Sequence, residues 1–173
     1  MKLAVVFFPV FMIICLENET ISAATTTASA TATIDASIDI SKDYDKKISA
    51  TGGDLDFGII IADNESGSVT IDPVDGKRHS SKKTSDIKKF GPAAFIVKGA
   101  KKKNHSIVLQ ENSIIVESNG NKMTVEKLLS NIKEGTINDN GESDFTVGGT
   151  LHVNPDQPSG TYTGTFTVSA AYD

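Results

Sequence analysis

The sequence is poor in cysteine, tryptophan and other aromatic residues. Cys15 is the one cysteine among 173 residues, there is no tryptophan, and aromatic residues make up 6% of the chain. A single cysteine excludes an intramolecular disulfide. Charged residues make up 23% and hydrophobic residues 38%, which is the balance of a folded chain rather than a disordered one. This length and composition predict one globular domain, with room for an additional arm.

The sequence also lacks the short motifs that mark common enzymes. It contains no HExxH, no GxSxG, no phosphate-binding loop and no CxxC. His79, His105 and His152 stand in unrelated surroundings. We expect His105 to be a packed or surface side chain, and His152 to point outward from a strand. The chain is therefore predicted not to be an enzyme.

Two groups of acidic residues come nearest to a chemical site. Asp54 and Asp56 flank Leu55 and could share one face of a strand, as paired acids do in glycosidases. No second motif and no aromatic sugar platform accompanies them, so we interpret them as solvent-facing residues. The turn at 63–65 lacks the ligand spacing of an EF-hand loop. We expect neither a metal ion nor a cofactor.

The first 24 residues have the layout of a secretory signal peptide. Lys2 is followed by an apolar run from Leu3 to Leu16, and small residues at Ser22 and Ala24 suggest cleavage before Thr25. The run is shorter than the roughly 20 residues that a membrane-spanning helix requires. Cleavage would remove the sole cysteine. We therefore expect an exported chain that passes through the periplasm to the cell surface, with no membrane span after cleavage.

The basic residues are concentrated in one part of the sequence. Residues 77–103 hold ten of the 17 lysine and arginine residues and a single acid, whereas residues 35–72 hold nine acids. Such asymmetry can steer association between molecules. The segment has no platform of aromatic residues interleaved with the basic ones, so nucleic-acid binding is not expected. The basic triplet is either a solvated hairpin tip or a contact for an anionic surface: Lys101, Lys102 and Lys103.

The clearest pattern lies just after the predicted cleavage site. From residue 28 to residue 40, apolar and polar residues alternate strictly, which predicts a long strand with one apolar face. A charged stretch at 41–47 then reads as a linker. The apolar face consists of Ala28, Ala30, Ala32, Ile34, Ala36, Ile38 and Ile40.

A second alternating strand is predicted at the other end of the chain, from Tyr162 to Tyr172. It follows a loop that is rich in proline and glycine. With the glycine that precedes the strand, one of its two faces forms a candidate assembly motif: Gly160, Tyr162, Gly164, Phe166, Val168, Ala170 and Tyr172.

Between these two ends, short apolar runs alternate with turn signals. We expect strands at 55–61, 68–71, 93–97, 106–109, 114–117, 145–147 and 150–153. The strands at 93–97 and 106–109 are expected to pair with each other, and 76–91 to form a long surface loop. The segment 124–133 is the one place where a helical turn is predicted. Gly148 and Gly149 predict a bulge or bend.

Many short strands separated by turns predict an all-β, antiparallel sandwich of the Ig-like or pilin-like kind, with an N-terminal extension strand. The expected division is a signal peptide at 1–24, an alternating arm and linker at 25–47, and the sandwich domain at 48–173.

The core, from LDFG at 55–58 through VGGTLHV at 147–153 to the end of the chain, resembles the DUF4402 family of exported bacterial β-proteins. The C-terminal motif, with Gly160 as the fourteenth residue from the end and Tyr172 as the penultimate one, resembles that of chaperone–usher pilus subunits, including spore coat U-like proteins. That resemblance implies a periplasmic chaperone and an outer-membrane usher as partners. It also implies that the arm is a donor strand which completes the sheet of a neighbouring subunit.

Two functions follow as hypotheses. In the first, the chain is a structural subunit of a surface fibre or coat, joined to like subunits by β-strand donation. In the second, the arm pairs within its own chain, and a self-completed monomer acts as a surface or periplasmic binding or adhesion module.

Overall fold

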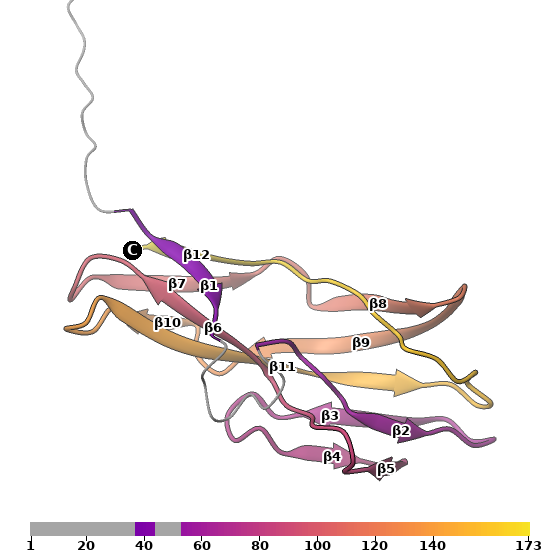
Figure 1. Ribbon diagram of the computed structural model, residues 1–173. Helices are drawn as coiled ribbons and strands as arrows, with labels where there is room; N and C mark the ends of the chain where they lie inside the picture. Colours follow the sequence, from indigo (N-terminus) through magenta and orange to yellow (C-terminus); the bar gives the residue numbers. More distant parts are fainter. Residues whose placement is uncertain (1–36, 44–52) are drawn as a thin grey trace, which may run out of the picture. The chain divides into compact units, whose positions relative to one another are not determined.

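All regular elements in the described part of the chain are β-strands. The computed structural model describes residues 37–43 and 53–173. Figure 1 shows the strands in their order along the chain. They are β1 (Asp39–Lys42), β2 (Ile59–Ile61), β3 (Gly67–Ile71), β4 (Arg78–Ser80), β5 (Lys83–Ser85), β6 (Ala93–Lys98), β7 (Asn104–Leu109), β8 (Ser113–Ser118), β9 (Asn121–Ser130), β10 (Glu134–Thr136), β11 (Glu142–Val153) and β12 (Val168–Tyr172).

Strand β11 organises a seven-stranded antiparallel sheet. Its first half pairs with β6 and its second half with β3, while β9 pairs along its opposite edge. β1 extends the sheet beyond β6, β4 extends it beyond β3, and β8 extends it beyond β9. Every β11 side chain from Phe145 to Gly149 is buried, as expected for a strand at the centre of a core.

A three-stranded sheet, in the order β10–β7–β12, packs on the large sheet. Ile107 of β7 belongs to the same buried cluster as Val97 of β6 and Phe145 of β11. A two-stranded ribbon of β2 and β5 completes the strands. The fold is therefore an all-β antiparallel sandwich, as predicted. No helix in the described ranges is long and apolar enough to cross a membrane.

The predicted pairing of 93–97 with 106–109 is wrong, although both segments are strands. β6 pairs with β1 and β11 in the large sheet, whereas β7 pairs with β10 and β12 in the small one. The turn at 99–103 carries the chain from one layer to the other, and Lys102 adopts a positive φ of 63° within it. Consecutive strands need not be neighbours in a sandwich.

The helical turn predicted at 124–133 is also wrong, because most of this segment belongs to β9. A β-bulge explains the error: Leu129 pairs with Gly148 and Glu126 with Thr150, so β9 carries one extra residue opposite β11. Lys127 occupies the bulge with a φ of 54°. The bulge puts Val125 and Leu128 on the same buried face, and their spacing of three imitates a helix. The irregularity predicted at Gly148 and Gly149 is confirmed.

The predicted loop at 76–91 contains two short strands, β4 and β5. Their residues are polar, so they lack the apolar alternation by which strands are recognised. Main-chain pairing with β3 and β2 holds them instead. Conversely, two predicted strands are shorter than expected: β2 begins at Ile59, and β12 begins at Val168.

The N-terminal alternating segment is only partly described. Residues 28–36 lie outside the described part of the chain, but the segment ends in β1, which pairs with β6 of the same chain. Ile40 lies opposite Val97, and Ile38 and Ile40 pack against the core. Ser41 and Lys42 also belong to β1, so the predicted linker does not begin at residue 41.

Candidate strand-accepting edge

The C-terminal strand β12 forms the edge of its sheet. It pairs with β7 on one side, and within the described structure no strand pairs with its other side. Thr167 and Asp173 share hydrogen bonds with Gln110 and Asn104 of the β7 side. Because hydrogen-bonded pairs alternate along an antiparallel ladder, the main-chain N–H and C=O groups of Ser169 and Ala171 also point toward β7. The main-chain groups of Val168 and Ala170 therefore point away from β7, toward the open edge.

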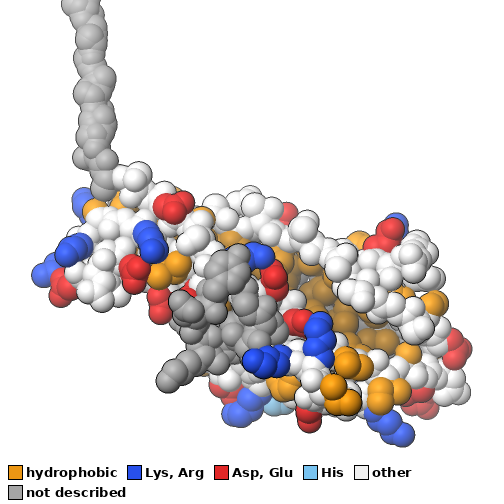
Figure 2. All heavy atoms as spheres, viewed as in Figure 1, with side chains coloured by type: hydrophobic (Ala, Val, Ile, Leu, Met, Phe, Trp, Pro, Cys, Tyr) orange, Lys and Arg blue, Asp and Glu red, His pale blue; other side chains and the backbone are white. Residues whose placement is uncertain are grey.

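Half-buried apolar side chains gather at the two ends of the described chain. Fifteen partly buried hydrophobic residues pack against the core, and ten of them lie before residue 61 or after residue 161. Figure 2 shows a hollow with a largely hydrophobic surface between the C-terminal segment and β2. We call this hollow the groove. The terminal residues that supply the half-buried apolar surface are Ile38, Ile40, Leu55, Phe57, Ile60, Tyr162, Phe166, Val168, Ala170 and Tyr172.

Three phenylalanine rings bridge the two layers beside this edge. Phe95 of β6 stacks on Phe145 of β11 with ring centroids 5.1 Å apart. Phe166, which precedes β12, meets Phe95 edge-on at 6.3 Å and an interplanar angle of 79°. Offset-stacked and edge-on arrangements are the favourable ones for aromatic pairs. Phe145 is fully buried, whereas Phe95 and Phe166 stay half-exposed.

The sequence matches one protein-family model, described as Domain of unknown function (DUF4402), over residues 46–172. The chain belongs to the DUF4402 family. No curated protein and no solved structure matches it. The match confirms the predicted family, but the family description names no function. The function is therefore inferred from the groove and from the open edge of β12.

The C-terminal tyrosine of the DUF4402 domain is used inside its own chain. The main-chain N–H of Ala100 donates a hydrogen bond of 2.6 Å to the Tyr172 hydroxyl oxygen. A Cβ on Gly99 would lie 2.4 Å from the same oxygen, so glycine is needed for this approach. Tyr172 thus fastens the end of β12 to the turn that joins the two layers.

The two glycines of the predicted C-terminal motif differ in their surroundings. A Cβ on Gly164 would meet the carbonyl oxygen of Ile115 at 2.4 Å. A Cβ on Gly160 would meet the Ser118 hydroxyl at 2.5 Å, and a hydroxyl can rotate away. Between the two glycines, Thr163 and Glu117 exchange both main-chain hydrogen bonds, at 2.9 and 3.1 Å. Gly164 therefore allows the chain to pass close to β8, a role that its sequence pattern did not indicate.

We expect Gly164→Ala to destabilise the domain by about 2 kcal/mol, because the new methyl group meets main-chain atoms that cannot move independently. Gly160→Ala is the matched control and should change stability by less than about 0.5 kcal/mol. Urea denaturation of both variants measures the difference. Equal stabilities of the two variants would show that the segment is not closely packed on β8.

The basic segment of the DUF4402 domain is largely neutralised within the chain. Lys88 pairs with Asp56 at 2.6 Å, and Arg78 pairs with Asp86 at 2.6 Å. In the predicted basic triplet, Lys102 lies 3.4 Å from Asp139, and all three lysines are exposed. Acids of the segment 35–72, such as Asp56 and Asp63, thus pair with bases of their own chain.

The acidic turn at 63–65 holds a lysine. The ammonium of Lys82 donates hydrogen bonds to the Asp63 carboxylate and to the Glu65 carbonyl oxygen. The Lys82 hydrogen bond, followed by that from the Glu65 N–H, lowers the pKa of Asp63. Among the described residues, no three His, Cys, Asp or Glu side chains lie close enough together to hold a metal ion.

The other acidic and histidine residues do not converge on one site. Asp54 is exposed and pairs with Lys42 at 2.5 Å. His152 is exposed, as predicted, and lies 3.1 Å from Glu126. His105 is fully buried, and neither ring nitrogen has a hydrogen-bond partner. It packs beside Gly135, so of the two predicted alternatives, a packed or a surface side chain, the structure has the packed one.

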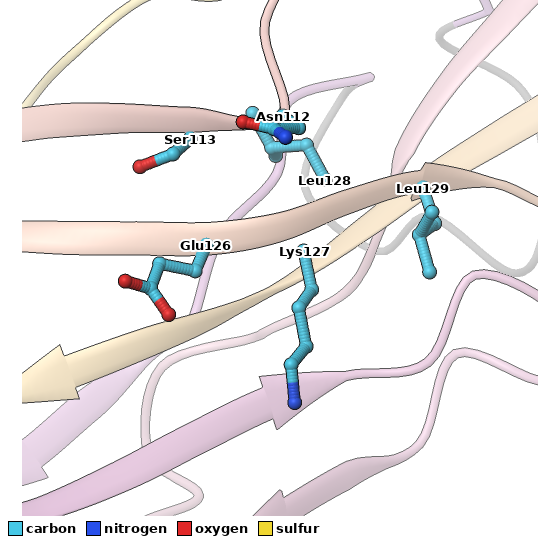
Figure 3. A pocket seen from close by; sticks show the side chains of 6 residues that line it. All are labelled: Asn112, Ser113, Glu126, Lys127, Leu128 and Leu129. Atoms are coloured by element: carbon cyan, nitrogen blue, oxygen red, sulfur yellow. The ribbon is translucent and has the colours of Figure 1, made fainter.

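A surface pocket of about 450 Å³ opens beside the β9 bulge. It is lined by Asn112 and Ser113 at the start of β8 and by residues 126–129 of β9. Figure 3 shows that the side chains of Glu126 and Lys127 extend in different directions, and that Ser113 points away from Leu129. Polar groups that point apart cannot act together on one substrate atom. The open edge of β12 is therefore the better functional candidate.

Proposed function

We propose that this DUF4402 protein is a non-enzymatic structural subunit of a surface fibre or coat, assembled by β-strand donation between like subunits. The observation that carries the proposal is the open edge of β12 beside a half-exposed apolar groove. A strand that added there would gain main-chain hydrogen bonds from Val168 and Ala170 and would cover apolar side chains. An uncovered edge of this kind is an aggregation hazard, which favours a dedicated partner.

The donated strand in this proposal is residues 28–36. Their alternation leads directly into β1, but β1 is already paired with β6, so Ile38 and Ile40 belong to the subunit's own body. This narrows the predicted donor to Ala28, Ala30, Ala32, Ile34 and Ala36.

The direction of β1 favours donation to another copy. Asp39, at the start of β1, lies opposite Lys98, and Tyr172, near the end of β12, lies opposite His105. Lys98 and Asn104 flank one turn, so the chain enters β1 at the end of the sandwich where β12 finishes. A segment that continues straight back from the start of β1 therefore leads away from β12 of its own chain.

Export, passage through the periplasm, and assistance by a chaperone and an usher belong to the same proposal. Their support is the signal-like N-terminus and the C-terminal pattern. Inspection of the neighbouring genes for a chaperone and an outer-membrane usher tests this part directly.

The edge itself is tested with proline. In Ala170→Pro, the lost N–H is one that points away from β7, and proline is tolerated at such edge positions. We expect this variant to fold and to lose the multimers that resist SDS until boiled. Ala171→Pro is the matched control: it removes an N–H that faces β7 and should lower stability. Undiminished multimers in a folded Ala170→Pro variant would refute strand donation at β12.

A self-completed monomer that acts as a binding or adhesion module is the second candidate. The intrachain pairing of β1 with β6 favours it, because part of the alternating segment is already used within the subunit. Sedimentation of the chain lacking residues 1–24 separates the two candidates. A stable monomer at all concentrations supports the module, and a concentration-dependent series of multimers supports the fibre subunit.

A further inference from the structure

We propose that the groove selects a donated strand with small side chains, and that Phe95 and Phe166 are the residues that set this size limit. The inference rests on the proposed function and names its partner: residues 28–36 of a second copy of this chain.

The donor side of the match is visible in the sequence. Along the apolar face of residues 28–36, four of the five positions are alanine, and Ile34 is the single larger side chain. A simple hydrophobic groove would favour bulkier residues at these positions, because apolar surface buried on binding stabilises the complex in proportion to its area. The alanines therefore indicate that the groove has little space for the side chains of the donated strand.

The acceptor side is visible in the packing of the rings. Phe166 directly precedes the segment that leads into β12, and Phe95 belongs to β6 of the large sheet. Their ring centroids lie 6.3 Å apart. Packed sheets lie about 10 Å apart, so two rings that meet edge-on span the space between the layers. Phe145 lies directly opposite Phe95 on the neighbouring strand β11, stacks on it at 5.1 Å and is fully buried, so the Phe95 ring cannot shift toward β11.

A strand added at the edge of β12 then finds the interior already occupied near Phe166. Its inward side chains can cover the exposed parts of the two rings, but they cannot push Phe95 toward β11 without moving Phe145. Alanine fits this requirement, since it buries a methyl group and loses no side-chain entropy. The bulky side chains thus lie on the acceptor and the small ones on the donor.

Neighbouring positions leave room for the single larger donor residue. Val168 and Ala170 follow Phe166 on the inward face of β12, and both are half-buried. These are short side chains, so an isoleucine can pack over them. One large residue among alanines would also fix the register, because a shift by two positions would bring Ile34 against a ring or out of the groove.

The test uses synthetic peptides of residues 25–36 and the full chain as acceptor. Binding of a labelled native peptide is compared with that of peptides carrying Ala28→Leu, Ala30→Leu, Ala32→Leu or Ala36→Leu. We expect the substitutions nearest the rings to weaken binding by about tenfold or more, as overpacking does. If every leucine peptide binds as tightly as the native one, or more tightly, the groove has no size limit and the inference fails.

Acceptor variants identify the rings as the cause. Phe166→Ala should restore binding of at least one leucine peptide relative to the native one, and Phe166→Leu should have a smaller effect in the same direction. Ile87→Ala is the control for a general loss of apolar surface, because Ile87 is 92% exposed and is not among the side chains packed against the core. An unchanged preference in both Phe166 variants would overturn the assignment, even if a size limit exists.

The outcomes also separate this inference from the proposed function. Failure of the native peptide to bind any acceptor, although multimers form, would overturn the choice of occupant and the proposed donor together. Binding of the native peptide without discrimination against leucine would leave strand donation standing and remove only the size limit.

Discussion

Removal of residues 25–36 is expected to yield a folded subunit that no longer forms multimers. The prediction follows from the position of β1: residues 39–42 pair with β6, and Ile38–Asp173 forms one compact unit. The deletion therefore leaves every described strand in place while it removes the proposed donor. The measurement is the ladder of SDS-resistant multimers. Multimers resist SDS because a donated strand dissociates slowly from its acceptor. The ladder should therefore disappear when the donor segment is removed.

A longer deletion, of residues 25–42, is the control that gives the first result its meaning. It removes β1, so β6 loses an edge partner and the apolar contacts of Ile38 and Ile40. We expect a loss of roughly 2–4 kcal/mol from the free energy of unfolding, from the ladder hydrogen bonds and the buried apolar area. Multimers that persist after removal of 25–36 would contradict donation by this segment, whatever the longer deletion does.

The pattern of short apolar runs between turn residues was a reliable guide wherever a strand packs against the core. It located β3, β6, β8 and the two halves of β11, because burial in a sheet selects apolar side chains along the strand. It failed at β4 and β5, whose polar residues are held by main-chain pairing and ion pairs. Neither force leaves a periodic mark on the sequence.

The errors in topology have a different origin. The sequence of a turn such as 99–103 does not show whether the next strand pairs with the preceding one or crosses to the other sheet. In the structure, Tyr172 packs against Gly99 and Ala100 of this turn, a contact between residues far apart in the sequence that no local pattern reveals. The bulge at Lys127 caused the wrong prediction of a helical turn, because one extra residue in a strand gives the buried residues on either side of it the spacing of a helix.

The candidate site was predictable in its residues but not in its geometry. The residues that alternation places on one face from Tyr162 to Tyr172 are half-buried in the structure, apart from Gly164. The alternation could not indicate that the strand shortens to Val168–Tyr172 or that its outer edge stays open. The aromatic contact between Phe95 and Phe166 joins residues 71 positions apart, so no local pattern reveals it.

Gly148→Ala is expected to be the most damaging single methyl group in the domain. A Cβ at this position would lie 2.2 Å from the carbonyl oxygen of Ile71 and 2.7 Å from Cδ of Pro73. Gly148 is buried in β11, where strands on both sides hold the main chain, so the clash cannot be relieved by rotation of a side chain. We expect a loss of roughly 3 kcal/mol or more in the free energy of unfolding.

The adjacent glycine supplies the matched control. A Cβ on Gly149 would meet only the side chains of Leu128 and Val125, each at 3.2 Å, and these can shift by a few tenths of an ångström. Gly149→Ala should therefore cost about 1 kcal/mol, as a modest overpacking of the core. Urea unfolding measures both variants, with an unchanged m-value as the sign that the denatured state is the same. If Gly148→Ala proved no worse than Gly149→Ala, then the main chain of β11 would not approach Ile71 and Pro73 as closely as the structure has it, and the large sheet would need a different register there.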